Sequence, residues 1–354
     1  MAVRGSEDRT LFVTGTRGCG KTSLVERLSQ QARSNGWLVF DVNAENALAS
    51  LFRQVVRFDT QTSTFSPRLR VTVLGSGATV GGKGSTKASH YTVDDLDTVF
   101  LEACTQARTG VFVTIDEIQK MELDDVSRVC GAFQMASRKG CDVALVAAGL
   151  PHAFEQIIHH DGCTYMRRSV HEELGLFSHD EVEQALRTAF GEIRGLDVSA
   201  AAMDELVARS GGHPYMMQLL GYHAVEYANQ HHASHPYELT CEDIQIIAPV
   251  ALEAYERRSL KPLVDAMSSG EADYVRAMVR VMGDGRVAAT GAVVETLGKT
   301  HQQVAPHRRG LMDSGVIVAG GHGEVRFNIP FLRDYLKKEK TQENALELLD
   351  EWDV

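Results

Sequence analysis

Short apolar runs alternate with amphipathic segments over the first 150 residues of the chain. Apolar runs of this length favour buried strands, and apolar residues at spacings of three and four favour helices. The predicted strands are 10–15, 37–42, 111–115 and 142–148, and the predicted helices are 21–34, 44–58, 93–107 and 123–139. Strands that alternate with such helices are typical of a parallel sheet with crossover helices. The pattern predicts an α/β domain over residues 1–170.

One segment of this domain breaks the alternation. Residues 60–90 are rich in Ser, Thr and Gly, with Gly-Ser-Gly at 75–77 and Gly-Gly-Lys-Gly at 81–84. Such composition is typical of loops. We expect a flexible insertion here, with one hairpin around 69–74.

Helical patterns dominate after Pro151. Ser178 and Glu181 have the spacing of a capping box, and helices are predicted at 199–210, 214–229 and 241–258. Three further helices, at 271–282, 291–297 and 302–313, precede a hairpin of 316–319 and 325–329, which predicts a winged helix-turn-helix. The expected divisions are a helical lid (171–240), a helical connector (241–270), a winged helix (271–340) and a tail (341–354).

A glycine-rich loop lies between the first predicted strand and helix. Residues 15–22, Gly-Thr-Arg-Gly-Cys-Gly-Lys-Thr, match the phosphate-loop pattern G-x-x-x-x-G-K-[ST] in the strand-to-helix context that it requires. Glycines let backbone N–H groups surround a phosphate at the positive end of a helix. Lys21 is expected to contact the β- and γ-phosphates of a nucleotide, and the Thr22 hydroxyl to ligate Mg²⁺. The residues expected at the nucleotide are Gly15, Thr16, Arg17, Gly18, Cys19, Gly20, Lys21, Thr22 and Ser23.

Two acids follow the apolar run 111–115. Carboxylates at a buried strand end are costly unless they meet a cation. Asp116 is therefore expected to hold Mg²⁺ through water, and Glu117 to orient and deprotonate the attacking water. The alternative is a strand that simply ends in solvent.

Charge and composition argue against several classes of function. The net charge of −11 argues against a general nucleic-acid coat, but residues 299–340 carry eight Lys and Arg against four acids, so any DNA contact is expected there. The six cysteines form no C-x-x-C pair, and the histidines lack the acids of a metal site. With no long apolar run and a polar N-terminus, we expect a cytoplasmic protein without a membrane span.

The chain resembles AAA+ ATPases of the origin-recognition-like and signal-transducing (STAND-like) branch. The resemblance is carried by the phosphate loop, by Asp-Glu-Ile-Gln at 116–119, by Ala-Gly-Leu-Pro at 148–151, by the segment 176–180, by Gly-Gly-His-Pro at 211–214 and by the C-terminal winged helix. It implies a P-loop NTPase sheet with a helical lid, ATP and Mg²⁺ as cofactors, and ATP hydrolysis.

The resemblance also implies roles for four further residues. His213 and Pro214 stand where the family places a lid helix near the nucleotide. Arg167 and Arg168 precede the lid, roughly where the family places an arginine finger that acts on a neighbouring subunit of a homo-oligomer. Surface arginines without a role are one alternative, and Arg17 inside the phosphate loop is another candidate for the finger.

Three departures from the family pattern suggest slow hydrolysis. The run 143–148 ends in Ala-Ala-Gly, where many relatives place a polar sensor residue. The lid segment lacks the sensor arginine, and only about ten residues precede the first strand, where the family usually has an adenine-contacting helix.

The partner of the winged helix stays open at this point. Gln303, His307, Arg308, Arg309 and Arg326 form a donor set suited to duplex DNA. Pro306 is expected to interrupt or restart the helix, and winged helices also serve as protein-contact modules. The hypotheses are thus a slow ATPase switch, a hydrolysis-deficient DNA-binding or adaptor module, and an ATPase whose winged helix contacts protein.

Overall fold

The computed structural model describes residues 9–62, 96–107, 109–231 and 236–339. The expected hairpin at 69–74 and the tail 341–354 lie outside these residues. The chain divides into two compact units: residues 1–15 with 21–174, and residues 16–20 with 175–354. The division therefore separates the middle of the phosphate loop from the helix that follows it.

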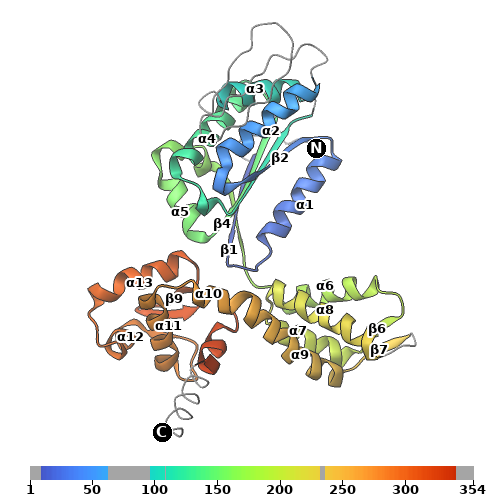
Figure 1. Ribbon diagram of the computed structural model, residues 1–354, viewed down its shortest axis with the longest axis vertical. Helices are drawn as coiled ribbons and strands as arrows, with labels where there is room; N and C mark the ends of the chain where they lie inside the picture. Colours follow the sequence, from blue (N-terminus) through green and yellow to red (C-terminus); the bar gives the residue numbers. More distant parts are fainter. Residues whose placement is uncertain (1–8, 63–95, 108, 232–235, 340–354) are drawn as a thin grey trace, which may run out of the picture. The chain divides into compact units, whose positions relative to one another are not determined.

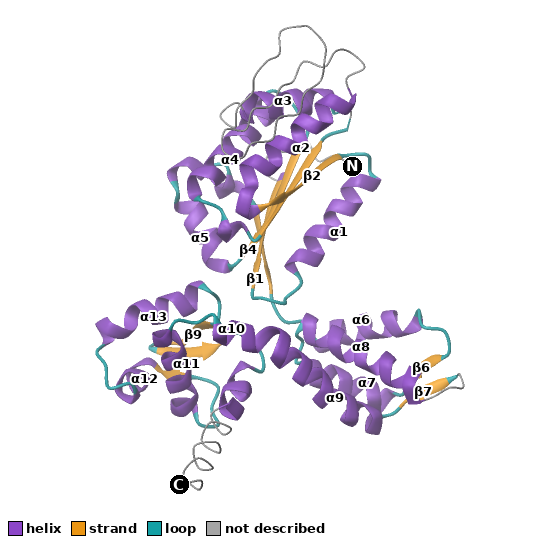
Figure 2. Cartoon of the chain, viewed as in Figure 1, coloured by secondary structure: helices purple, strands orange, loops and turns teal. Residues whose placement is uncertain are grey.

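The first unit is built on a five-stranded parallel sheet (Figures 1 and 2). The strands are β1 (Thr10–Gly15), β2 (Leu38–Asn43), β3 (Val111–Asp116), β4 (Val143–Gly149) and β5 (Val170–Leu174), in the order β2-β3-β4-β1-β5. The predicted α/β class is confirmed. Strand β5 was not predicted, because its sequence Val-His-Glu-Glu-Leu is polar and its side chains are mostly exposed at the edge of the sheet.

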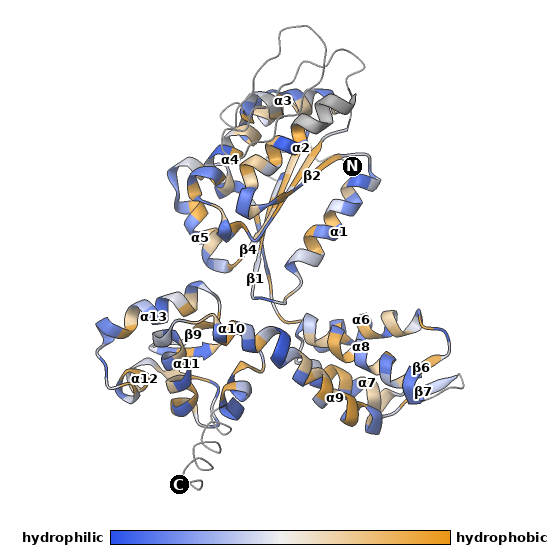
Figure 3. Ribbon diagram, in the orientation of Figure 1, coloured by the Kyte–Doolittle hydropathy of each residue, from blue (hydrophilic) through white to orange (hydrophobic). Residues whose placement is uncertain are grey.

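Helices cover both faces of this sheet (Figure 1). One face packs against α1 (Lys21–Ser34), and the other against α2 (Ala47–Thr62), α3 (Leu96–Gln106), α4 (Leu123–Arg138) and α5 (Pro151–His159). Side chains alternate between the faces along a strand, so Phe12 packs in the α2–α5 core while Val13 packs beside α1. Strands β1 to β4 are accordingly among the most hydrophobic parts of this unit (Figure 3). Helix α2 continues to Thr62, so the first residues of the expected insertion are helical.

The second unit begins with a helical lid. It contains α6 (His179–Gly191), α7 (Ala200–Ser210), α8 (Pro214–His231) and α9 (Cys241–Tyr255), with a short parallel pair, β6 (Leu196–Val198) and β7 (Tyr237–Leu239). The predicted capping box is present, because Ser178 and Glu181 bond reciprocally at the start of α6.

A winged helix follows the lid. Helix α9 continues through a π-helical turn, Glu256–Leu260, into α10 (Lys261–Asp265). The winged-helix domain, called the wing below, then contains α11 (Ser269–Met282), α12 (Thr290–Thr296) and α13 (His301–Asp313). Its antiparallel sheet has the order β8-β10-β9, formed by β8 (Ala288–Ala289), β9 (Ile317–Gly321) and β10 (Glu324–Phe327). The predicted winged helix is confirmed. Helix α13 runs through Pro306 without a break.

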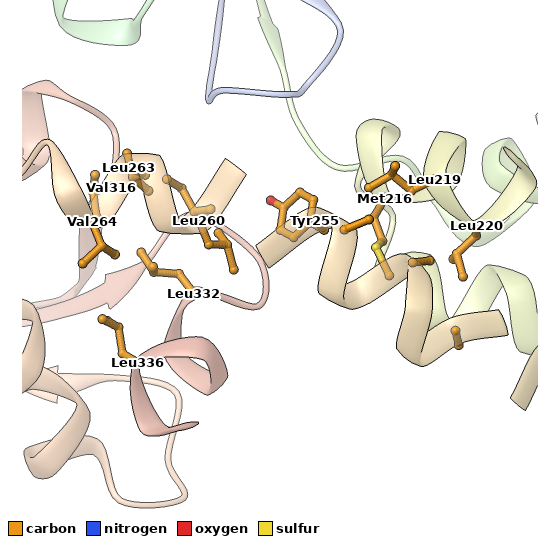
Figure 4. Packing of buried hydrophobic residues seen from close by; sticks show 14 of the residues in the cluster. Met216, Leu219, Leu220, Tyr255, Leu260, Leu263, Val264, Val316, Leu332 and Leu336 are labelled. Carbon is orange, nitrogen blue, oxygen red and sulfur yellow. The ribbon is translucent and has the colours of Figure 1, made fainter. Parts of the chain in front are cut away.

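One hydrophobic core joins the lid to the winged helix. It runs from Val182 in α6 to Leu336 beyond the wing. Figure 4 shows Tyr255 between lid residues such as Met216 and C-terminal residues such as Leu260 and Leu332. The expected boundaries at 240 and 270 therefore fall within one packed unit. Among the described helices, none has an apolar stretch long enough to cross a membrane.

Candidate nucleotide-binding site

The ammonium group of Lys21 is buried at the first turn of α1. Lys21 is only 6% exposed, and its Nζ donates a hydrogen bond to the carbonyl oxygen of Gly15 at 2.8 Å. A buried ammonium group needs oxygen partners, because removing it from water is otherwise costly. The end of β1 and the start of α1 are thereby joined through this cation.

The loop before Lys21 has the backbone that a phosphate cradle needs. Gly18 and Gly20 have φ of 78° and 94°, in the region that favours glycine. Cys19 between them is buried, while Arg17 and Gly18 are exposed. Successive N–H groups in such a turn can point toward one anion.

Thr22 lies beside the acid at the end of β3. The Thr22 hydroxyl donates to Asp116 Oδ2 at 2.6 Å, and the backbone N–H of Glu117 donates to Asp116 Oδ1 at 2.9 Å. Two oxygen groups that can act as metal ligands, a hydroxyl and a carboxylate, thus lie side by side. Mg²⁺ prefers such ligands and completes its shell with phosphate and water. The donor set fits the expected metal.

Glu117 occupies an unusual backbone position. It has φ of 56° and ψ of 40°, the left-handed region, which costs a residue with a side chain about 1 to 2 kcal/mol. Its carboxylate Oε2 accepts a hydrogen bond from Gln119 Nε2 at 2.8 Å. Strained residues held by their surroundings are concentrated at functional sites. The partnership with Gln119 was not predicted, because nothing in the spacing shows where that side chain points.

Asp41 joins α1 to the sheet beside this site. Its carboxylate accepts hydrogen bonds from Ser29 at 2.8 Å and Thr114 at 2.7 Å, and also from Arg33. Burial alone raises the pKa of Asp41, but the bonds from Thr114, Arg33 and Ser29 together lower it below the ordinary value of 3.8. A cleft of about 600 Å³ extends from this group to Asp116 and Glu117. The sequence alone did not single out Asp41.

The segment Gly-Gly-His-Pro positions a buried histidine in the second unit. Gly211 and Gly212 both have positive φ, and a Cβ on Gly212 would lie 2.4 Å from the Phe177 carbonyl oxygen. His213 is 1% exposed, and burial, opposed by the bond to Arg17, lowers its pKa below the ordinary value of 6.5. Pro214 opens α8, where a missing N–H costs nothing.

His213 contacts the part of the phosphate loop that belongs to the same unit. Its Nε2 lies 3.4 Å from the carbonyl oxygen of Arg17, and its Nδ1 accepts from the Met216 N–H at 3.4 Å. Because a carbonyl can only accept, Nε2 carries the proton, and a neutral ring satisfies both partners. A Cβ on Gly18 would lie 2.8 Å from the His213 ring, so this loop glycine is also required sterically.

Arg167 and Arg168 lie near the amino ends of the strands in the first unit, whereas Gly15, where the phosphate loop begins, lies at a carboxyl end. The next strand, β5, pairs Val170 with Leu11, whereas Gly15 pairs with Leu174 at the other end. The two arginines therefore precede the amino end of β5. Arg167 Nε donates to the Ile158 carbonyl at 2.6 Å, and Arg168 lines a cavity that also contains Thr10. Neither side chain is placed to act on its own chain's loop.

The basic C-terminal segment is largely paired with acids. The side chains within 4.0 Å of a carboxylate are Lys299, Arg309, Arg333, Lys337 and Lys338. Most of the partners, Asp273, Asp284 and Glu256, lie outside the segment in sequence, so the sequence count overstated its free positive charge.

The expected DNA-contacting side chains are placed unevenly. Gln303 accepts from Thr300 as part of a capping box, and His307 packs against Gly270. Arg308, contrary to expectation, turns inward: its Nε is buried, and its guanidinium faces Tyr274. Arg309, 86% exposed in its side chain, and Arg326 remain at the surface.

Two parts of the chain match families of known protein domains. Residues 1–146 match the AAA ATPase domain family. This part of the chain is therefore similar to AAA ATPase domains. Residues 258–336, which include the winged-helix elements from α11 to β10, match a domain of unknown function (DUF8462). A comparison with curated proteins gave no match.

Solved structures share the fold of both units. The chain is similar to the Aeropyrum pernix ORC2 protein in its ADPNP–ADP complexes, with 15% identity over 96% of this chain and 89% of that one, and a TM-score of 0.61. The ADP form of the same protein has 14% identity over 94% and 88% of the two chains, and a TM-score of 0.54. At these identities the likeness establishes the fold and leaves the activity to other observations.

The Asp41 cluster predicts a pH-dependent stability. Because the folded-state pKa of Asp41 is lowered, its ionised carboxylate stabilises the fold; the contribution is full above about pH 5 and is lost as pH falls through the folded-state pKa. In urea unfolding, the parent should be more stable than Asp41→Asn at pH 7, and this difference should shrink toward pH 3. Asp197→Asn, an exposed aspartate on β6, is the matched control. A difference that is the same at pH 7 and pH 3 would contradict the assignment.

Proposed function

We propose that this protein binds ATP with Mg²⁺, hydrolyses it slowly and uses the bound nucleotide as a switch for its winged helix. The observation that carries the proposal is the junction of α1 with β3: Thr22, next to the buried Lys21, is bonded to Asp116. The match of this region to the AAA ATPase domain supports it. The similar ORC2 structures are described as ADPNP and ADP complexes, which supports an adenine nucleotide as ligand.

Each element of the site has a role in binding. The N–H groups of residues 16–22 donate to phosphate oxygens, with the positive end of α1 behind them. Lys21 exchanges the Gly15 carbonyl for phosphate oxygens. Thr22 and Asp116 hold Mg²⁺, which supplies positive charge against the phosphates when bound.

Glu117 performs the proton transfer. A water oxygen bonds to the γ-phosphorus as the bond to the β–γ bridging oxygen breaks, and Glu117 accepts a proton from that water while ADP leaves. Strand β4 ends in Ala147, Ala148 and Gly149, so those positions offer no polar side chain for the water. This supports a low rate.

Arg167 and Arg168 act, in this proposal, on a second copy of the chain. They precede the amino end of β5, whereas Gly15 pairs with Leu174 at the other end of that strand. An arginine supplied by a neighbour offsets charge on the γ-phosphate in the transition state. The proposal therefore includes a homo-oligomer as the efficient form of the enzyme.

A row of packed rings connects the loop to the winged helix inside the second unit. The His213 ring, which contacts Arg17, lies 5.3 Å from the ring of Tyr255, and Tyr255 lies 5.7 Å from Phe331. Phe331 immediately precedes the core residue Leu332. Packed cores move between discrete arrangements rather than deform continuously. A nucleotide that shifts residues 16–20 can therefore bias the wing, to the extent that it binds the two arrangements with different affinity.

Lys21→Ala and Glu117→Gln separate binding from hydrolysis. Lys21→Ala removes the cation that faces two phosphates, so ATP affinity by calorimetry should fall strongly while the fold is kept. Glu117→Gln keeps the size of the side chain but not the base, so ATP should bind as in the parent and turnover should fall about 100-fold or more.

Two results would contradict these roles. Unchanged ATP affinity in a folded Lys21→Ala protein would overturn the binding assignment, and parental turnover in Glu117→Gln would overturn the catalytic one. ATP binding without turnover in the parent would favour the alternative of a nucleotide-stabilised adaptor.

The partner of the winged helix is, in this proposal, a protein rather than duplex DNA. The ion pairs of Lys299, Arg333, Lys337 and Lys338 occupy basic groups that phosphates would need, and Arg308 faces inward. On the expected DNA-reading face, Arg309 lies 4.0 Å from Asp313.

Salt-dependent binding to a DNA duplex tests this choice. Arg309→Ala/Arg326→Ala should bind duplex DNA with the same affinity and salt slope as the parent. The matched control is Arg187→Ala/Arg209→Ala, which removes two exposed arginines from the lid. If the slope of log affinity against log salt concentration falls by about 0.9 for each arginine removed from the wing, and the control is unchanged, the winged helix instead binds DNA.

A further inference from the structure

Gln119 connects the ends of the neighbouring strands β3 and β4 beside the candidate active site. It lies in the short turn Ile118–Lys120 that follows Glu117. Its Nε2 donates to Glu117 Oε2 at 2.8 Å, and its Oε1 accepts from the Leu150 N–H, just after β4, at 3.2 Å. Both ends of one carboxamide are thus used, one on the proposed base and one on the neighbouring strand end.

Gly149 provides the space for this carboxamide. A Cβ at residue 149 would lie 2.8 Å from Gln119 Oε1 and 2.8 Å from Ile118 Cγ2. Real Cβ atoms do not approach so closely, so a larger residue there would displace Gln119. The absence of a side chain at the end of β4 and the presence of Gln119 are therefore linked: the amide reaches from β3 into the space that a residue on β4 would fill.

The hydrogen bond from Gln119 makes the two oxygens of the Glu117 carboxylate inequivalent. Oε2 is held by Gln119, and among the described residues no hydrogen bond to Oε1 is found. A general base must be held within hydrogen-bond reach of the proton that it removes. Fixing one oxygen against a strand end sets the direction in which the other faces.

We propose that Gln119 is a positioning residue for hydrolysis, which holds the Glu117 carboxylate in the orientation needed to accept a proton from water. The inference rests on the proposed ATPase function. Gln119 does not itself take the proton, but acts through Glu117. Its hydrogen bond from the Leu150 N–H fixes the Gln119 side chain at the end of β4, and the Gln119 side chain in turn orients the Glu117 carboxylate.

Two isosteric variants separate positioning from a merely structural role. Gln119→Glu keeps the length and the acceptor for the Leu150 N–H, but it replaces the donor to Glu117 with a like charge. Gln119→Met loses both bonds. If Gln119 positions Glu117, both variants should lower kcat about 10- to 100-fold, since small misplacements of a catalytic group cost that much. The Kd for ATP should stay within about twofold of the parent, as expected where an interaction is needed only for the chemical step.

The matched control is Gln230→Glu on α8. Gln230 also donates its amide to a glutamate, Glu226, at 3.5 Å, so the chemical change is the same at a site without a proposed role in hydrolysis. This variant should keep the parental kcat.

The outcomes are distinct. Parental kcat in Gln119→Glu would overturn the inference, because the Leu150 bond alone would then suffice, and the proposed function would stand. Loss of ATP affinity in both Gln119 variants would also overturn it, by assigning Gln119 to the fold or to binding. No turnover by the parent would refute the proposed hydrolysis, and the inference with it.

Discussion

The burial of the Lys21 ammonium group is the constraint on which the candidate site depends. A cation with so little exposure is stable only if oxygen atoms replace its water. The Gly15 carbonyl provides one such atom at the end of β1. The first turn of α1 is thereby fixed against that strand, and Thr22 reaches Asp116 on β3. Phosphate oxygens would satisfy the same cation more strongly, because they are charged.

The middle of the phosphate loop packs within the second unit. Lys21 and Thr22 belong to the first unit, whereas residues 16–20 belong to the second, where His213 contacts the Arg17 carbonyl. The lid and the wing share one continuous core, so a change in the backbone of residues 16–20 can be transmitted through packed side chains to the C-terminal helices.

Features that depend on local sequence could be predicted. The phosphate loop, the acids at the end of β3, the Ser178 capping box and the winged helix were all indicated by residue type and spacing, because turns, caps and apolar periodicity act over a few residues. Strand β5 was missed because an exposed edge strand need not be apolar. The helix Pro151–His159 was also missed, although Pro at its first turn is a known start signal.

Features that depend on tertiary contacts could not be predicted. Asp284 lies about 50 positions from Arg333 and Lys337, so no local count of charge could show that it neutralises part of the basic segment. The inward turn of Arg308 toward Tyr274 and the link from Gln119 to Leu150 are of the same kind. Such contacts follow from how the elements pack, and they change the interpretation of the wing and of the catalytic site.

A crystal structure with a non-hydrolysable ATP analogue and Mg²⁺ tests the central claim most directly. The account predicts that Lys21 Nζ leaves the Gly15 carbonyl for phosphate oxygens, that Thr22 and Asp116 face the metal, and that Glu117 remains bonded to Gln119. An analogue bound away from residues 15–22, or phosphates that leave the Lys21–Gly15 hydrogen bond in place, would contradict it.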